Sequence, residues 1–253
     1  MPERWDRADA YEAYVGRWSR LVAPRFLAWA GVSAGGATLD VGCGSGALGH
    51  AALAHGAARV VGLDRSPAYA ADAAAATGRS ASFVAGDAAR LPFARATFDA
   101  AVSGLVLNFL PDPVAAMREL ARVVRPGGTV AAYVWDYAGR MELPRHFWDA
   151  ATELAPAVAG PLDEGVRFPL CRPEALAVLF RAASLATVAT AALDVPTVFR
   201  DFADYWSPFL GGQGPAPGYV LSLAPAARAR PREHLRQRLP HAPDGSVALV
   251  ARA

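Results

Sequence analysis

Short apolar runs alternate with helix-like segments along the first half of the chain. The apolar runs predict strands at residues 37–41, 59–64, 81–87, 97–104 and 129–135. Between them, apolar positions at helical spacing, capping residues and closing glycines predict helices at residues 46–56, 66–78 and 112–124. Strands that alternate with helices pair in parallel and are covered on both faces, because right-handed crossovers place the helices there. The pattern predicts a doubly wound α/β sheet.

After residue 135 the alternation stops, and proline and glycine become frequent. Helices are predicted at residues 143–154, 173–183, 202–209 and 228–238, and strands at residues 185–199 and 246–252. The glycines and prolines of residues 211–218 predict a loop. A tight turn at Asp244 and Gly245 precedes the last strand, so we expect one of these two strands to run antiparallel at the sheet edge. The expected sheet is Rossmann-like, mostly parallel and seven-stranded.

Composition narrows the possible classes of protein. All 25 basic residues are arginines, lysine is absent, and the net charge is only +2, so codon bias explains the arginines better than a nucleic-acid surface does. Cys43 and Cys171 are far apart in the sequence and suggest neither a disulfide framework nor a zinc site. The histidines are dispersed, so we expect no metal. Without a membrane-length apolar stretch or a signal-peptide pattern, we expect a soluble cytoplasmic protein.

The stretch LDVGCGSGALG, residues 39–49, carries two overlapping glycine patterns. Gly44, Gly46 and Gly49 match the dinucleotide fingerprint, which would suit an NAD(P)-dependent oxidoreductase. The predicted strand ends at residue 41, however, so the turn itself contains Gly42, Gly44 and Gly46. Asp40 then lies near the place of a phosphate, which its charge would repel. A ligand with an ammonium or sulfonium group would fit this turn better.

Two further acids end the next two predicted strands. Asp64 follows Gly44 by 20 residues, a spacing from which a carboxylate accepts both hydroxyls of a ribose. Asp87 ends the third strand and could accept from the exocyclic amine of an adenine. A lone aspartate at a strand end is as often a turn or cap residue. Three such acids, with no basic residue in the glycine turn, describe a cationic adenosine ligand without phosphate, such as S-adenosylmethionine.

Four segments within about residues 37–135 carry a resemblance to a known family: LDVGCGSG, VVGLDRSP, FVAGDAARLPFARATFDAAVSGLVLNFLPDP and RVVRPGGTVAAYVW. On these segments the sequence resembles the class I S-adenosylmethionine-dependent methyltransferases, of the small-molecule type that includes ubiquinone and menaquinone C-methyltransferases. The resemblance implies a seven-stranded sheet whose last strand is antiparallel. It also implies that the methionine part of the cofactor is held by Asp40 and the backbone of Gly42, Cys43, Gly44 and Gly46.

The resemblance assigns the remaining cofactor contacts by position. Asp64 would hold the ribose, and Arg65 would lie beside the adenine. Asp87 and the amide of Ala88 would hold the adenine edge, and Ser103 would meet the methionine amino group. In the N-terminal segment, Tyr14 and Arg20 are predicted to close over the cofactor, and Arg17 and Arg20 can each pair with its carboxylate. The alternative for this segment is an amphipathic helix whose rings pack on the sheet.

Beyond residue 135 the resemblance weakens, so candidates for the methyl acceptor come from position and chemistry. They are Asn108, Trp135, His146 and Trp206. His146 is the best-placed general base, since imidazole titrates near neutrality. A surface or capping role for this histidine, and a core role for the aromatic residues, are the alternatives.

The chain is therefore expected to be a single methyltransferase domain, residues 1–253. Its predicted parts are an N-terminal helical cap at 1–30, a cofactor-binding core at 36–135, an acceptor-side cap and sheet edge at 136–245, and a last strand at 246–253. Methyl transfer would be an in-line displacement onto a small molecule, driven mainly by positioning. Residues 103–109, SGLVLNF, lack the Pro-Pro stretch of nucleic-acid amino-methyltransferases. A silent binder of S-adenosylmethionine or S-adenosylhomocysteine is the other alternative.

Overall fold

The computed structural model describes residues 12–67 and 81–253. The chain divides into two compact units. One, here called the sheet unit, comprises residues 19–134 and 172–193. The other, here called the helical unit, comprises residues 1–18, 135–171 and 194–253. The predicted helix at 66–78 lies mostly outside the described residues, as does the start of the predicted N-terminal cap.

The described part of the sheet unit contains a parallel five-stranded sheet with the strand order β3-β2-β1-β4-β5. Its strands are β1 (Ala37–Val41), β2 (Arg59–Asp64), β3 (Ala81–Ala85), β4 (Phe98–Gly104) and β5 (Val124–Tyr133). Asp40 of β1 lies opposite Gly62 on one side and Val102 on the other. Strand order reverses beside β1, and ligands of such sheets bind at the carboxyl ends of the strands at that point.

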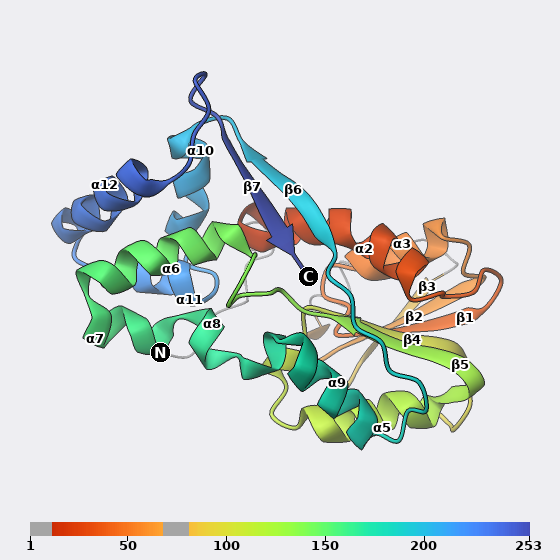
Figure 1. Cartoon of the computed structure of the whole chain (residues 1–253). Helices are drawn as coiled ribbons and strands as arrows, with labels where there is room; N and C mark the ends of the chain where they lie inside the picture. Colours follow the sequence, from red (N-terminus) through yellow and green to blue (C-terminus); the bar gives the residue numbers. More distant parts are fainter. Residues whose placement is uncertain (1–11, 68–80) are drawn as a thin grey trace. The chain divides into compact units, whose positions relative to one another are not determined.

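Helices cover both faces of this sheet (Figure 1). They are α2 (Arg17–Trp29) and α3 (Ala47–Ala54) on one face, and α5 (Pro113–Val123) and α9 (Pro173–Ala182) on the other. The N-cap of α5 is Asp112, whose side chain accepts a hydrogen bond from the Ala115 amide at 2.9 Å. The Phe26 ring of α2 packs on Tyr133 of β5, with ring centroids 4.8 Å apart. The predicted doubly wound arrangement is confirmed for this unit.

The helical unit contains a two-stranded antiparallel hairpin and short helices. The hairpin pairs β6 (Asp194–Phe199) with β7 (Val247–Arg252). The α-helices are α6 (Glu142–Leu154), α7 (Pro156–Ala159), α8 (Glu164–Arg167), α10 (Phe202–Trp206), α11 (Pro215–Ser222) and α12 (Ala229–Arg238). The π-helical turn η1 is Glu12–Gly16. Over the described residues of both units, the short 3-10 turns are η3 (Leu107–Phe109), η4 (Gly160–Leu162), η5 (Pro169–Cys171), η6 (Ser207–Leu210) and η7 (Pro225–Arg228).

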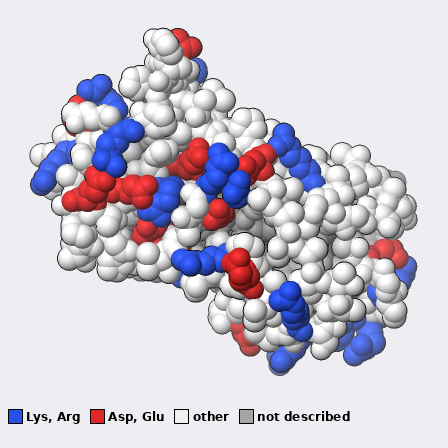
Figure 2. Space-filling model, viewed as in Figure 1, with Lys and Arg blue, Asp and Glu red and all other residues white. Residues whose placement is uncertain are grey.

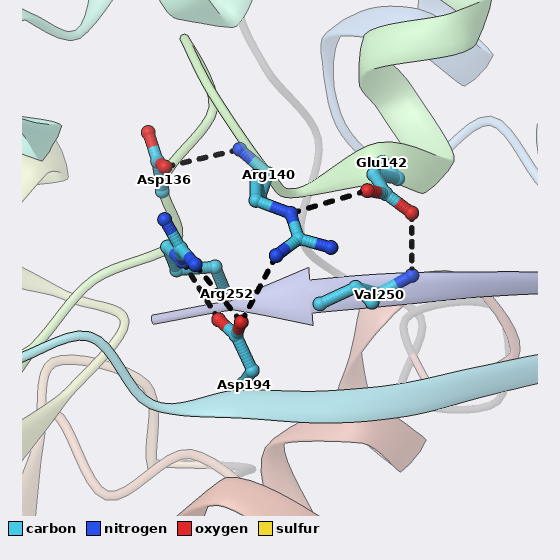
Figure 3. A network of polar contacts seen from close by, with 6 residues as sticks. All are labelled: Asp136, Arg140, Glu142, Asp194, Val250 and Arg252. Atoms are coloured by element: carbon cyan, nitrogen blue, oxygen red, sulfur yellow. Dashed lines mark hydrogen bonds and ion pairs between the residues drawn. The ribbon is translucent and has the colours of Figure 1, made fainter.

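A polar network ties this hairpin to the segment that precedes α6 (Figure 3). Asp194 accepts hydrogen bonds from Arg252 Nε at 2.7 Å and from Arg140 Nη1 at 3.3 Å. Glu142 pairs with Arg140 and accepts from the Val250 amide at 2.7 Å. Three segments far apart in the sequence are thereby joined by charge-assisted hydrogen bonds.

The expectation of seven strands in one sheet is wrong. In the part of the chain that the structure describes, the sheet has five strands, and β6 and β7 form a separate two-stranded sheet. Ala251 of β7 also forms an isolated antiparallel bridge with Met141. Pro196 lies within β6 and has no N–H to donate to a further strand, which suits a sheet edge. Residues 185–193 form no strand, so the predicted strand at 185–199 shrinks to its second part.

The predicted loop at 211–218 is also partly wrong, because α11 begins at Pro215. Gly214 precedes this helix with a φ of 89°, and Pro215 takes the first helical position, where its missing N–H costs nothing. On the face drawn in Figure 2, arginines and acidic side chains are interspersed, in keeping with the small net charge. None of the described helices is both long enough and apolar enough to cross a bilayer.

Candidate functional site

The turn after β1 is built from glycines with two different constraints. Gly42, Gly44 and Gly46 have φ angles of 74°, 49° and 85°, a region that side chains disfavour. A Cβ on Gly42 would collide with the Val106 side chain, whereas a Cβ on Gly44 would meet nothing within 4 Å. The first glycine is therefore needed for packing. The second leaves bare backbone beside open space, as a ligand cradle requires.

Gly49 has a different role, since it lies inside α3. A Cβ there would come within 3.2 Å of Val60 Cγ1 and 3.4 Å of Asp40 Oδ2. This glycine therefore lets the helix pack closely on β1 and β2. Such packing occurs in many sheets of this class and does not by itself indicate a dinucleotide.

Asp40 is the most unusual group at this edge of the sheet. It is 1% exposed, and neither carboxylate oxygen has a hydrogen-bond partner. Burial raises the pKa of Asp40 to about 7; the nearby Gly49 amide, which lies outside hydrogen-bond geometry, opposes this shift, and the charge of Asp64 adds to it. Buried carboxylates are almost always paired. An acid left unpaired here is suited to a cationic ligand group.

The next acid, Asp64, bridges the glycine turn and the start of the following segment. Its Oδ2 accepts from the Gly44 amide at 3.0 Å, and its Oδ1 accepts from the Ser66 amide at 2.9 Å. A carboxylate has about four acceptor positions, so lone pairs remain for a ligand hydroxyl. The structure thus brings Asp40, the glycine turn and Asp64 together at the carboxyl ends of β1 and β2.

Asp87 lies just past the end of β3, and its side chain is exposed. It accepts from the Ala89 amide at 2.9 Å, and Ala88 beside it is 4% exposed. Arg65, after β2, is exposed as well. Arg65 follows β2, and Asp87 and Ala88 follow β3, so they lie after neighbouring parallel strands, as the sequence indicates.

Two further residues of the predicted set, Cys43 and Ser103, are also buried in the sheet unit. Burial raises the pKa of the Cys43 thiol, which opposes a role as nucleophile. Ser103 is fully buried, and its hydroxyl donates to the Val41 carbonyl at 2.8 Å, across β4 and β1. With its proton so engaged, Ser103 can only accept from an amino group.

The remaining predicted residues are the two N-terminal cofactor residues, Tyr14 and Arg20, and the four acceptor candidates, and they divide between the two units. Arg20 is exposed on α2 and Asn108 follows β4 within η3, both in the sheet unit, and the side-chain nitrogen of Asn108 is buried without a partner. Four others belong to the helical unit: Tyr14, Trp135, His146 and Trp206.

Within the helical unit, aromatic packing dominates the surroundings of these residues. Tyr14 meets Phe209 edge-on at 5.6 Å, and Trp206 stacks on Phe202 at 6.3 Å. The Tyr14 hydroxyl and the Trp135 Nε1 are buried without partners. Burial lowers the pKa of His146, so its imidazole is neutral at pH 7.

Residues 39–132 match a family model described as a methyltransferase domain. The chain carries a methyltransferase domain. This domain contains the glycine turn and the three strand-end acids, and the cofactor it implies is S-adenosyl-L-methionine. The described residues contain no group of three or more histidines, cysteines or acids that could hold a metal ion.

Curated relatives overlap mainly with the methyltransferase domain. An uncharacterized protein of Mycobacterium tuberculosis is 36% identical over 121 residues, which are 47% of this chain and 44% of that protein. The 2-methyl-6-phytyl-1,4-hydroquinone methyltransferase of Synechocystis is 28% identical over 193 residues, 74% of this chain and 59% of that protein. The chain therefore spans about half the length of the curated relatives it matches.

A solved structure extends the likeness to the fold of nearly the whole chain. It is a putative methyltransferase from Bacillus halodurans, 15% identical, with a TM-score of 0.58 and coverage of 91% of this chain and 94% of that one. At this identity the match shows a shared Rossmann-like fold.

The site residues fit the implied cofactor. The unpaired buried carboxylate of Asp40 complements a cation, and the open space beside Gly44 leaves room for a ligand against bare backbone. No basic residue stands between residues 42 and 46, where a dinucleotide phosphate would need one or a neutral surface. A cationic nucleoside is accommodated here more readily than a diphosphate.

Proposed function

We propose that the protein transfers a methyl group from S-adenosylmethionine to a small-molecule acceptor. The observation that supports this most directly is the buried, unpaired Asp40 carboxylate beside a glycine turn that contains no basic residue. A second support is the methyltransferase domain over residues 39–132.

In this proposal, the methionine part of the cofactor lies against Asp40 and the turn of Gly42, Cys43, Gly44 and Gly46. The Asp64 carboxylate accepts the ribose hydroxyls. Arg65, Asp87 and the Ala88 amide surround the adenine, and Ser103 accepts from the amino group. Tyr14 and Arg20 contribute from the N-terminal segment.

When bound, S-adenosylmethionine supplies a methyl group on a sulfonium, ready for displacement. The residues of the chain contribute alignment of the acceptor and exclusion of water rather than covalent chemistry. The lowered pKa of His146 keeps its imidazole unprotonated at pH 7, so it can take a proton from an acceptor hydroxyl or amine.

The parts of the chain divide this work. Residues 36–135 form the cofactor-binding core, and residues 136–245, after an N-terminal cap at 1–30, provide the acceptor side. Asn108, Trp135, His146 and Trp206 are the proposed acceptor residues. A hydroquinone is the acceptor named for the Synechocystis relative, and an aromatic small molecule suits the ring-rich helical unit. Residues 103–109 favour such an acceptor over a nucleic acid.

Calorimetry on the full chain tests the proposal. We expect S-adenosylmethionine and S-adenosylhomocysteine to bind, and NAD and NADP not to bind. Tight NAD(P) binding without S-adenosylmethionine binding would identify an oxidoreductase instead. Consumption of S-adenosylmethionine is then measured over a library of phenols, amines and carboxylic acids. Binding without turnover anywhere in the library would favour a silent binding protein.

A further inference from the structure

A cluster of unpaired hydrogen-bond donors lies in the helical unit, around Arg17. The Arg17 guanidinium is held over the Trp18 ring, 4.3 Å from its centroid, and 5.1 Å from the centroid of Phe199. Its Nε and Nη2 are buried and make no hydrogen bond. The Nε1 of the neighbouring Trp18 is also buried without a partner. Three buried donors on consecutive residues therefore have no acceptor.

A fourth unpaired group comes from the hairpin. Thr197 is fully buried in β6, and its hydroxyl has no partner. Side chains two residues apart on a strand point to the same face, so Thr197 shares a face with Phe199, over which Arg17 lies. Two elements far apart in the sequence thus direct unsatisfied polar groups toward the same aromatic surface.

Asp204 is the acidic residue whose charge acts on the pKa of Arg17, but it accepts no hydrogen bond from Arg17 Nε or Nη2. Burial lowers the pKa of the Arg17 guanidinium, and the charge of Asp204 opposes this shift. The Asp204 carboxylate, however, accepts from Arg200, through its backbone amide at 3.0 Å and its side chain at 3.4 Å. Stacking on two rings supports the charge of Arg17 but supplies no acceptor for its N–H groups.

The identity of the unpaired atoms defines the missing partner. Nε and Nη2 carry the two parallel N–H bonds on one edge of a guanidinium, the edge that grips both oxygens of a carboxylate. Arginine and tryptophan side chains can only donate, and the threonine hydroxyl can donate as well. Buried donors without acceptors are rare in folded proteins unless a ligand or ordered water completes them.

We propose that this donor cluster, Arg17, Trp18 and Thr197, binds the carboxylate of an aromatic methyl acceptor. The rings of Trp18 and Phe199 already lie 5.6 Å apart and supply apolar contact for the body of such a molecule. This inference rests on the proposed function and specifies its acceptor. The methionine carboxylate of the cofactor offers the same chemistry, so the experiment must separate the two sources.

The test measures binding of aryl carboxylates, led by 4-hydroxybenzoate, each beside its carboxamide, to the full chain. S-adenosylhomocysteine is titrated separately. The variants are Arg17→Met, which keeps a long apolar stem but removes the donors, and Thr197→Val, which removes only a hydroxyl. Arg230→Met, on the exposed surface of α12, is the matched control. Circular dichroism establishes that each variant is folded.

We expect the wild-type chain to bind the acid about tenfold or more tightly than its amide, because the parallel N–H groups of Arg17 Nε and Nη2 bind both oxygens of a carboxylate. Arg17→Met should lose this preference, Thr197→Val should weaken acid binding several-fold, and Arg230→Met should change nothing. The dissociation constant of S-adenosylhomocysteine should stay within about twofold in every variant. If Arg17→Met does not fold, Thr197→Val and Arg17→Lys decide the matter, since lysine keeps the charge without the parallel N–H groups.

Two results would overturn the inference while leaving the proposed function intact. In one, Arg17→Met weakens S-adenosylhomocysteine binding about tenfold and keeps the acid preference, which assigns Arg17 to the methionine carboxylate. In the other, no acid of the panel binds better than its amide. Failure of the wild-type chain to bind S-adenosylmethionine or S-adenosylhomocysteine would instead refute the proposed function.

Discussion

At the residue scale, the protonation of Asp40 links stability to cofactor binding. Its folded-state pKa of about 7 lies above the ordinary aspartate value of 3.8, so the folded state binds a proton more tightly than the unfolded state does. The stabilisation from this group is complete below about pH 4 and is lost as the pH rises through about 7. Ionised Asp40 is therefore costly in the empty site, yet it is the form that a cationic ligand needs.

The variant Asp40→Asn tests this linkage. Between about pH 5 and pH 8, the wild-type chain should lose about 2–3 kcal/mol of unfolding free energy that the variant does not lose. Urea denaturation at a series of pH values measures the difference. Cofactor affinity should rise through about pH 7 in the wild-type chain, whereas the variant should bind weakly at every pH. Parallel stability profiles for the two chains would contradict the assignment.

Asp64→Ala should weaken cofactor affinity by about 2–4 kcal/mol, because two ribose hydroxyls lose a charged acceptor. The Gly44 and Ser66 amides lose the same acceptor, so the turn itself should loosen. Titration calorimetry with S-adenosylhomocysteine gives the affinity. An unchanged dissociation constant would remove Asp64 from the ribose role.

The positions of this glycine turn and of the acids at the strand ends were predictable because they depend on local sequence alone. A glycine turn after a buried strand and an acid at each of the next two strand ends need no knowledge of distant contacts. The unpaired donors of Arg17 and Trp18 left no such signal. Whether a guanidinium has a partner depends on residues as distant as Phe199 and Asp204, which only the folded chain brings near.

At the scale of elements, the glycines of the turn after β1 have different roles: Gly42 is needed for packing, whereas Gly44 leaves room for a ligand. Gly42→Ala adds a collision with Val106 to an unfavourable φ and should lower the unfolding free energy by about 2–4 kcal/mol. Gly44→Ala meets only the unfavourable φ and should cost about 1–2 kcal/mol. Its added methyl group occupies the open side of the turn, so cofactor affinity should fall more than stability.

Denaturation and calorimetry on both variants check this contrast. Equal destabilisation would mean that Val106 yields easily to the new methyl group. Wild-type affinity in Gly44→Ala would place the ligand elsewhere.

The elements themselves were predictable where local pattern and packing agree. Helix α5 has its cap, its proline and its apolar spacing in one short stretch, and the structure begins it at Pro113 as expected. Helix α11 was not predicted because proline usually breaks a helix. Pro215, however, takes the first helical position, where a proline is favourable. That β6 and β7 form a separate sheet could not be predicted from the sequence, because strand pairing is decided by long-range contacts.

At the scale of the whole molecule, the network around Asp194 joins the hairpin to the segment before α6 (Figure 3). Asp194→Ala removes the acceptor of both Arg140 and Arg252 and should lower the unfolding free energy by about 1 kcal/mol. Glu233→Ala, which breaks an exposed pair with Arg236 inside α12, should leave it unchanged. Thermal denaturation of the two variants measures this difference, and an equal response would show that the network adds nothing.

The two compact units are interleaved along the chain, which passes between them after residues 18, 134, 171 and 193. Helix α9 returns to the sheet unit after the helical unit has begun and packs against α5. Residues 39–132, the stretch matched to the methyltransferase family, thus lack helix α9, which belongs to the same compact unit. A shortened chain ending at residue 134 would leave the outer side of α5 uncovered, and any exchange of acceptor specificity between relatives must transplant α9 with its own sheet.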